Sequence, residues 1–388
     1  METAYRLTAW IEEHLLLRNE IVEPFFAREA LRMTEAGREM GERFLRGGRL
    51  LAFGRGSYAT DAQHVSVEFV HPEFSHRVSA HSGAAGRRSL PALDLSMAFQ
   101  PWLDAILRPE DIAMGFGPPE SDPEVLIALA SAYARKAMTF ALPGPHGSYT
   151  LEAATLDPFI HQEMIEIFHH MLWETVHVFL EPRDPGQEKS HLVAEAAASI
   201  RRKVRDGTIL RMQLADEQAE QIGSMTVAMH RRLSQGGRLI FFGNGGSATD
   251  ANDWALDCIL PPAGYHSIPA ISLSMEPASI TALASDVGPE GIFLRQLIAA
   301  QATPDDVAIG ISTSGDSRNV VVTLEEARRR GLLTVALLGC DGGEIYRRNL
   351  VDFPLVVRSD HILRVQEAQA SAYHVIREML EVLYRDGA

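Results

Sequence analysis

The chain contains two copies of one segment, and this duplication constrains the fold more than any other feature. Residues 49–68 read RLLAFGRGSYATDAQHVSVE and residues 238–257 read RLIFFGNGGSATDANDWALD, which align without a gap. The match continues downstream, where LPALDLSM (90–97) aligns with IPAISLSM (268–275). Halves with matching sequences must share a fold, so the sequence predicts two copies of one domain.

Each half alternates short apolar runs with helical patterns, which is typical of a doubly wound parallel sheet. The fold class is therefore α/β, with two tandem domains and flanking helices. The predicted boundaries are 1–182 and 190–388, and the linker EPRDPG (181–186) between them has two prolines and a glycine. Residues 71–89 read as a loop inserted in the first half only. The expected strands lie near 50–53, 92–95, 112–115 and 138–142, then near 239, 271, 307, 334 and 354.

Composition restricts the class of protein. The formal net charge is −15, which argues against a partner nucleic acid because such binding needs a basic face. Only Cys258 and Cys340 are present, so a disulfide framework is not expected and a reducing compartment fits. The sequence shows neither a signal peptide nor an apolar run of membrane-spanning length. We expect a soluble, cytoplasmic protein without a membrane partner.

Two loops of the second half are predicted to bind phosphate. The turn GNGGS (243–247) follows an apolar run and opens a helix that Ser247 is expected to cap. Backbone N–H groups and the helix dipole favour an anion there. The loop ISTSGDS (311–317) offers four hydroxyls before another helix. Ordinary turns and N-capping are the alternative, and two such loops in one half favour phosphate.

These motifs carry a family resemblance. GNGGSATDA (243–251), ISTSGDSRNV (311–320) and a terminal helix with Gln366 resemble the SIS (sugar isomerase) family, and within it the phosphoheptose isomerases. The resemblance implies a sugar-phosphate substrate or ligand. It departs at Ser285, where the family usually has Asn. The substrate-binding positions it implies are Asn244, Gly245, Gly246, Ser247, Asp286, Ser312, Thr313, Ser314, Ser317 and Gln366.

The same resemblance implies a divalent metal ion, Zn²⁺ in type, held by a His and a Glu on one helix and a Gln and a His on the last helix of the half. The first half supplies these residues as His64, Glu68, Gln162 and His170. The i, i+4 spacing puts His64 and Glu68 on one helix face. In the second half the corresponding positions are Asp253, Asp257, Gln366 and His374, and the two aspartates make this set the less favoured metal site.

The two halves have lost opposite features. The first half has GPPESD (117–122) in place of the serine loop. Its two prolines lack backbone donors, and Glu120 would repel a phosphate. Its glycine turn carries Arg55 for the Asn and Tyr58 for the Ser. The first half thus keeps the metal-type residues, and the second keeps the phosphate loops.

The resemblance implies a metal-dependent aldose–ketose isomerase acting through an enediol. Such a reaction needs a base, an acid and stabilisation of oxyanion charge. We assign Glu68 as the base, His170 as its acid/base partner and the ion as electrophile. The alternative is a non-catalytic sugar-phosphate sensor or a partner-binding regulatory protein. Metal content and turnover distinguish the two.

Helix geometry suggests that the halves complement each other. Gln162 and His170 are separated by about 12 Å of rise and roughly 80° of rotation, so one straight helix does not readily bring both to one ion. We expect a pseudo-dimer with a composite site, and further association into a homo-oligomer. The composite site would join His64, Glu68 and His170 to the serine loop, the glycine turn and Gln366, while the mirror set with Asp253, Asp257 and His374 would be degenerate.

Overall fold

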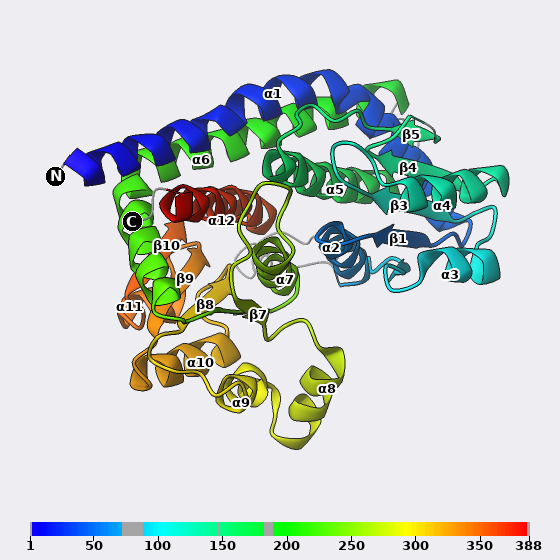
Figure 1. The fold of residues 1–388 in the computed structure, drawn as a ribbon. Coiled ribbons are helices and arrows are strands. Elements are labelled where there is room, and N and C mark those ends of the chain that lie inside the picture. The colour runs from blue at the N-terminus through cyan, green and yellow to red at the C-terminus, as the bar shows by residue number, and fades with distance from the viewer. Residues whose placement is uncertain (1, 72–87, 146, 182–188, 386–388) are drawn as a thin grey trace. The chain divides into compact units, whose positions relative to one another are not determined.

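The computed structural model describes residues 2–71, 88–145, 147–181 and 189–385 (Figure 1). The chain forms two compact units. The first-half unit is Asn19–Thr208, and the second-half unit combines Met1–Arg18 with Ile209–Ala388. The boundaries between the units fall inside two long helices, α1 (Glu2–Leu45) and α6 (Lys189–Ser234). Compactness therefore divides the chain at different places from the sequence repeat, and the domain limits 1–182 and 190–388 stay a prediction.

The first-half unit is built on a parallel sheet of order β2-β1-β3-β4-β5. Its strands are β1 (Leu50–Gly54), β2 (Ala92–Asp94), β3 (Ile112–Phe116), β4 (Met138–Leu142) and β5 (Tyr149–Thr150). Its further helices are α2 (Tyr58–Val70), α3 (Phe99–Ile106), α4 (Pro123–Ala134) and α5 (Pro158–Leu180).

The second-half unit repeats this plan with a parallel sheet of order β7-β6-β8-β9-β10. Its strands are β6 (Leu239–Gly243), β7 (Ala270–Ser272), β8 (Val307–Ser312), β9 (Leu333–Gly339) and β10 (Phe353–Val357). Its further helices are α7 (Gly246–Ile259), α8 (Pro277–Asp286), α9 (Ile292–Ala299), α10 (Arg318–Arg329), α11 (Gly343–Arg347) and α12 (Ile362–Arg385), and η1 (Pro289–Gly291) is a 3₁₀ turn. The predicted α/β class and the predicted duplication of a parallel sheet are confirmed.

Burial on both faces of each sheet explains the apolar runs. All five residues of β1 and of β6 are buried. Along β6, Phe241 belongs to the core on one face of the sheet, while Ile240 and Phe242 belong to the core on the other. Because successive side chains point to opposite faces, a strand covered on both sides must be apolar throughout.

The glycine that ends each first strand is required by a close approach of backbone. A Cβ at Gly54 would lie 2.2 Å from the Tyr58 carbonyl oxygen, and one at Gly243 would lie 2.4 Å from that of Ser247. Both distances are far below van der Waals contact, so the following helix can start this near the strand only if the residue is glycine.

Three details differ from the sequence-based expectation or lie beyond it. Ser247 is not the N-cap of α7, because Gly245 takes that position with φ of +56° and Ser247 lies in the first turn. The two-residue strand β5 was not predicted, since two residues are too short to show a period. The expected insertion loop (71–89) and the expected linker (181–186) fall largely on residues 72–87 and 182–188, which lie outside the described residues.

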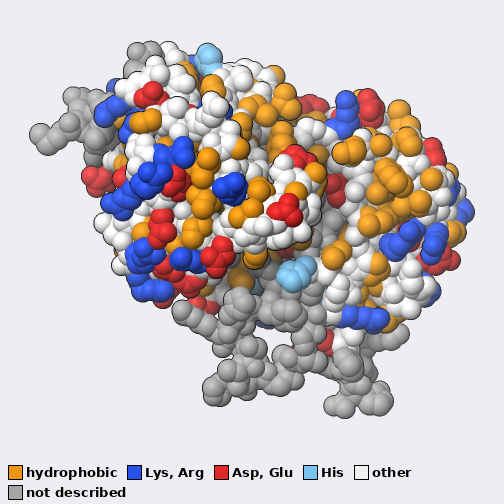
Figure 2. Space-filling model, turned by 90° about the horizontal axis from the view of Figure 1, so that it is seen from below, with side chains coloured by type: hydrophobic (Ala, Val, Ile, Leu, Met, Phe, Trp, Pro, Cys, Tyr) orange, Lys and Arg blue, Asp and Glu red, His pale blue; other side chains and the backbone are white. Residues whose placement is uncertain are grey.

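One face of the molecule shows how its charged side chains are distributed. Acidic and basic side chains are intermixed on the face shown in Figure 2, and neither kind forms one continuous area there. Within the part of the chain that the structure describes, no helix has the length and hydropathy needed to cross a membrane. Cys258 and Cys340 form no disulfide.

Candidate active site

The serine loop of the second-half unit (residues 311–317) lies at the end of β8 and is held by a tight glycine turn and by internal hydrogen bonds. Gly315 has φ of +70°, and a Cβ there would lie 2.1 Å from the Gly342 carbonyl oxygen. The Ser312 hydroxyl oxygen accepts from the Gly315 N–H at 3.1 Å and donates to the Ser317 hydroxyl oxygen at 3.1 Å. Ser317 is the N-cap of α10 but makes no side-chain capping bond. The positive end of α10 is thus not neutralised by a side chain of its own.

An amide pair joins the glycine turn to this loop. Asn244 Nδ2 donates to Asn319 Oδ1 at 2.9 Å, and Asn319 Nδ2 donates to Asn244 Oδ1 at 2.8 Å. The predicted positions Asn244 and Ser317 are therefore brought together in one unit. Asn319 was not among the predicted site residues, although it stands in the quoted motif two residues after Ser317.

The corresponding loop of the first-half unit is closed by charged side chains. Asp122 aligns with Ser317, and its Oδ1 accepts from the N–H groups of Glu124 at 2.9 Å and Val125 at 3.1 Å. Arg55 aligns with Asn244, and its Nη1 lies 2.9 Å from Glu124 Oε1. A carboxylate thus already occupies the positive end of α4, where an anion would bind.

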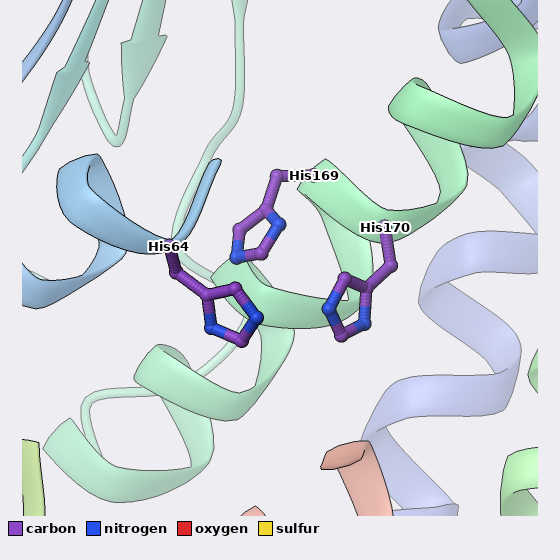
Figure 3. A group of neighbouring side chains, drawn as sticks. All are labelled: His64, His169 and His170. Carbon is purple, nitrogen blue, oxygen red and sulfur yellow. The ribbon is translucent and has the colours of Figure 1, made fainter. Parts of the chain in front are cut away.

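Buried imidazoles and a carboxylate gather between α2 and α5 of the first-half unit. His64 projects from α2, and His169 and His170 project from α5, with their rings turned toward one another (Figure 3). One ring nitrogen from each lies within 4.8 Å of the others. Glu68 on α2 lies between the two histidines of α5, because its Oε1 is 3.1 Å from His170 Nε2 and its Oε2 is 3.1 Å from His169 Nδ1.

The electrostatics of this cluster favour an ionised Glu68 and a neutral His64. Burial raises the pKa of Glu68, but the imidazoles of His170 and His169 outweigh it and hold that pKa well below its usual range. Burial lowers the pKa of His64 well below its ordinary value; Glu68 opposes this shift, and His169 and His170 add to it. Neutral imidazole is the form that binds a metal ion.

The structure places the four predicted metal-type residues of the first half as follows. His64, Glu68 and His170 lie together, with His64 Nε2 at 4.0 Å from Glu68 Oε1. Gln162 lies two turns before His170 on α5, and its Nε2 points to Asp61 Oδ2 at 3.4 Å. Sequence reasoning missed His169, which a family pattern with one histidine does not include; the adjacent pair of histidines was the available signal.

The second-half unit has the matching cluster between α7 and α12. His374 Nε2 lies 3.6 Å from Asp253 Oδ2 and 3.4 Å from Asp257 Oδ2, and all three residues are buried. The Tyr373 hydroxyl donates to Asp253 Oδ2 at 2.8 Å. Burial and the nearby Asp253 carboxylate raise the pKa of Asp257 to about 7. Of the other predicted residues, Gln366 is buried in α12 and Asp286 is exposed at the end of α8.

Comparisons with known proteins identify the family. A model described as SIS domain matches residues 204–339. Phosphoheptose isomerase of Trichlorobacter lovleyi is 37% identical over 183 residues, which cover 47% of this chain and 92% of that protein. Phosphoheptose isomerase of Geobacter sulfurreducens is 38% identical over 183 residues, which cover 47% of this chain and 95% of that protein.

Solved structures extend the likeness of fold to both halves. The C-terminal domain of glucosamine-fructose-6-phosphate aminotransferase from Francisella tularensis has a TM-score of 0.61 at 8% identity and covers 95% of this chain and 96% of that one. A protein from Silicibacter pomeroyi has a TM-score of 0.54 at 16% identity, with 98% of each chain covered. The chain therefore belongs to the SIS-domain family, with two parallel-sheet halves and homology to phosphoheptose isomerases over about half its length.

Proposed function

We propose that this protein is a sugar-phosphate isomerase that interconverts an aldose and a ketose, similar to sedoheptulose 7-phosphate isomerase, and that it uses a divalent metal ion. The observation that carries the proposal is the buried cluster of His64, Glu68, His169 and His170 in a chain that also keeps an uncapped serine loop. The identity to proteins named phosphoheptose isomerase supports it.

Phosphate binding is assigned to the second-half unit. Hydroxyls of Ser312, Thr313, Ser314 and Ser317 are donors to a dianion, and the free positive end of α10 adds to them. The glycine turn, with Asn244, Gly245, Gly246 and Ser247, is proposed to complete the phosphate contacts. Gln366 and Asp286 are proposed to contact the sugar. The amide pair between Asn244 and Asn319 fixes the glycine turn beside the serine loop.

Proton transfer is assigned to Glu68 and His170. Glu68 is ionised at neutral pH, because its pKa is held low, so it is in the form that accepts a proton from carbon. His170 Nε2 lies 3.1 Å from Glu68 Oε1, a distance that supports its proposed role as the acid/base partner of Glu68. His169 contacts the other carboxylate oxygen and fixes the orientation of Glu68.

The donor set fits a Zn²⁺-type ion. Imidazole nitrogens suit zinc, and His64, His169 and His170 bring three of them within 4.8 Å of one another. Gln162 is kept as a proposed further ligand. When bound, such an ion supplies Lewis-acid stabilisation of negative charge on a sugar oxygen. The nearby neutral His64 needs no deprotonation before it binds.

A sugar-phosphate sensor is the second candidate. It is favoured by the closed loop of the first-half unit, where Asp122 caps α4 and Arg55 pairs with Glu124. A chain that had lost turnover could retain the serine loop for binding alone. The composite site shared by the two halves, and the pseudo-dimer that would form it, stay predictions.

Metal analysis combined with turnover of sedoheptulose 7-phosphate tests the proposal. We expect the purified protein to contain a divalent metal and to isomerise the sugar phosphate. Glu68→Gln should abolish turnover, while binding of the sugar phosphate, measured by calorimetry, persists. A wild-type protein that binds the ligand but shows neither metal nor turnover would establish the sensor instead.

A further inference from the structure

We propose that the first-half unit binds a small organic cation, an ammonium group on an apolar body, in a cavity between α3 and α4. The cavity has a volume of about 360 Å³, which suits a small molecule. Arg55, Met97, Gln100, Glu124 and Ile127 are among the residues that line it, and all belong to this unit. The proposal does not depend on isomerase activity, because binding of the cation alone defines it.

The cavity lies where open parallel sheets bind ligands. Arg55 directly follows the last residue of β1, and Met97 lies three residues after the end of β2. Because β1 and β2 are neighbouring parallel strands, both residues lie at the carboxyl edge of the sheet, outside which such sheets bind ligands. Residues 117–122, all within the described part of the chain, do not line the cavity. The site is therefore not the counterpart of the serine loop.

A short connection leaves this part of the first-half unit uncovered. Residues 95–111 join β2 to β3 through α3, whereas residues 273–306 join β7 to β8 through α8, η1 and α9. Ile127 on α4 is 64% exposed, while its aligned residue on α10, Val322, is half-buried. In Figure 1 the helix α3 lies next to α4 at one end of the first-half unit. The cavity thus reflects the sequence of this half and is not a feature that both halves share.

Apolar side chains form one part of the lining. Met97 is fully exposed, and Ile127, Phe99 and Pro101 lie with it around the cavity. The Phe99 ring stacks on the buried Phe53 with centroids 5.0 Å apart, so this wall is fixed by the core. Covering such exposed apolar surface with an apolar body is favourable, because it removes that surface from water.

Carboxylates outnumber basic groups at the polar part of the lining. Arg55 Nη1 lies 2.9 Å from Glu124 Oε1 and 3.5 Å from Asp122 Oδ2. A third carboxylate, Asp94, accepts a hydrogen bond at 2.6 Å from the hydroxyl of Ser96, which also lines the cavity. One guanidinium thus stands among three carboxylates. The excess negative charge attracts a cation and repels a phosphate or a carboxylate.

The ion pair between Arg55 and Glu124 can give way to a ligand. The Glu124 side chain is 63% exposed and that of Arg55 is 49% exposed, and pairs between exposed side chains contribute little to stability. When an ammonium group pairs with Glu124, Arg55 keeps Asp122 as its partner. The ligand therefore gains a carboxylate without leaving the guanidinium unpaired.

Gln100 supplies a second acceptor for the ammonium group. Its Nε2 donates to Asp104 Oδ1 at 3.1 Å, which fixes the orientation of the amide. Its Oε1 is buried and has no hydrogen-bond partner among the described residues. Buried polar atoms are nearly always hydrogen-bonded, and an ammonium group offers three donors and no acceptor. A carboxylate ligand offers no donor, so the unused oxygen also favours a cation.

Titration calorimetry of the full chain with n-hexylamine, which is protonated at neutral pH, tests the proposal. We expect n-hexylamine to bind about tenfold more tightly than n-hexanol, because its hydrogen bonds are charge-assisted, and n-hexanoate not to bind. Glu124→Gln should weaken the binding of n-hexylamine by about tenfold and leave that of n-hexanol unchanged. Ile127→Ser and Met97→Ser should weaken the binding of both. Val322→Ser, at the aligned position of α10, is the matched control and should change neither.

Several results would refute the assignment. Equal affinity for n-hexanol and n-hexylamine would show that charge is not recognised, and tighter binding of n-hexanoate would make this an anion site. Unchanged affinity for n-hexylamine in both Ile127→Ser and Met97→Ser would place the amine elsewhere, and absence of binding to the wild type would remove the site. Both substituted side chains are exposed, so we expect the variants to fold, which circular dichroism checks.

Discussion

Single residues around the two clusters show how the two halves hold the same pair of helices together. Trp173 Nε1 donates to the Glu68 backbone oxygen at 3.0 Å, and Arg377 Nε donates to the Asp257 backbone oxygen at 3.1 Å. These contacts are equivalent in the two halves, although the donors differ completely. The helix pair is therefore fixed by a hydrogen bond to the same carbonyl, which leaves the clustered side chains free to differ between halves.

Serine loop hydroxyls give the first prediction. Ser314→Ala and Ser317→Ala each remove a donor to a phosphate dianion, and charge-assisted hydrogen bonds contribute roughly 1.5–3 kcal/mol, so binding of the sugar phosphate should weaken by about tenfold or more. Titration calorimetry measures the change. Ser121→Ala, in the equivalent first-half loop, is the matched control and should have little effect. Equal losses at both loops would show that phosphate binding was assigned to the wrong half.

His161 gives a prediction about pH. It is 1% exposed, and burial lowers its pKa to about 4, against a smaller upward effect of the Gly117 carbonyl and of Glu120. The folded state therefore favours neutral imidazole, so its contribution to stability is complete above the unfolded pKa near 6.5 and is lost as the pH falls toward 4.

The aligned second-half residue, Val365, supplies the matched substitution for His161. Between pH 6.5 and pH 4, the free energy of unfolding of His161→Val should fall by up to about 3 kcal/mol less than that of wild type. Urea unfolding at several pH values measures this difference. If wild type and variant lose stability in parallel over this range, His161 does not titrate as described.

The candidate site was only partly predictable at the level of residues. The i, i+4 spacing indicated that His64 and Glu68 share a face of α2, and the structure places them together. Periodicity within one helix cannot show which face of α5 packs on α2, so His169 was missed although it contacts Glu68 directly. The resemblance named Gln162 instead, and no contact of the described structure tests that role.

Helix ends explain the opposite losses at the scale of elements. The start of α4 is capped by Asp122, which accepts two backbone N–H bonds, whereas the start of α10 has Ser317 without a side-chain bond. A helix capped by its own carboxylate is stable without a ligand. A helix that begins with a serine making no capping bond can present its N–H groups to an anion.

Capping gives the third prediction. Asp122→Ala should destabilise the first-half unit by about 1 kcal/mol, because two N–H groups lose their acceptor. Ser317→Ala should change the stability of the ligand-free protein by a few tenths of a kcal/mol only, as its hydroxyl does not cap α10. Thermal unfolding without ligand compares the two. An equal or larger loss for Ser317→Ala would contradict the open helix end.

Strands were predicted well from sequence because a sheet covered on both faces needs continuous apolar runs, as in β1 and β6. The exact start of α7, in contrast, was not predicted correctly from the sequence. Its chain enters through Gly245 at positive φ, a conformation that depends on the tight approach of helix to strand and leaves no capping role for Ser247. Local preference for serine at an N-cap is weaker than this steric demand.

At the scale of the whole molecule, the compact units do not follow the order of the chain. Ile11 and Leu15 of α1 belong to the core of the second-half unit, together with Leu214 and Ile222 of α6. Arg18 is fully buried and its Nη2 lies 2.9 Å from Glu378 Oε2 on α12. The first 18 residues are therefore part of a unit whose remainder begins at residue 209.

This division gives the last prediction. A fragment of residues 190–388, which the sequence repeat suggests as a domain, lacks Ile11, Leu15 and Arg18, and so leaves apolar surface exposed and Glu378 without its arginine. Removing one partner of a buried ion pair costs about 3–5 kcal/mol. We expect the fragment to be far less stable in urea than the same unit in the full chain.

Arg18→Met in the full chain should reproduce the ion-pair part of the loss. Arg18→Met combined with Glu378→Met should recover much of that loss, because both charges are then removed together. A fragment 190–388 as stable as the intact chain would show that α1 is not part of this core.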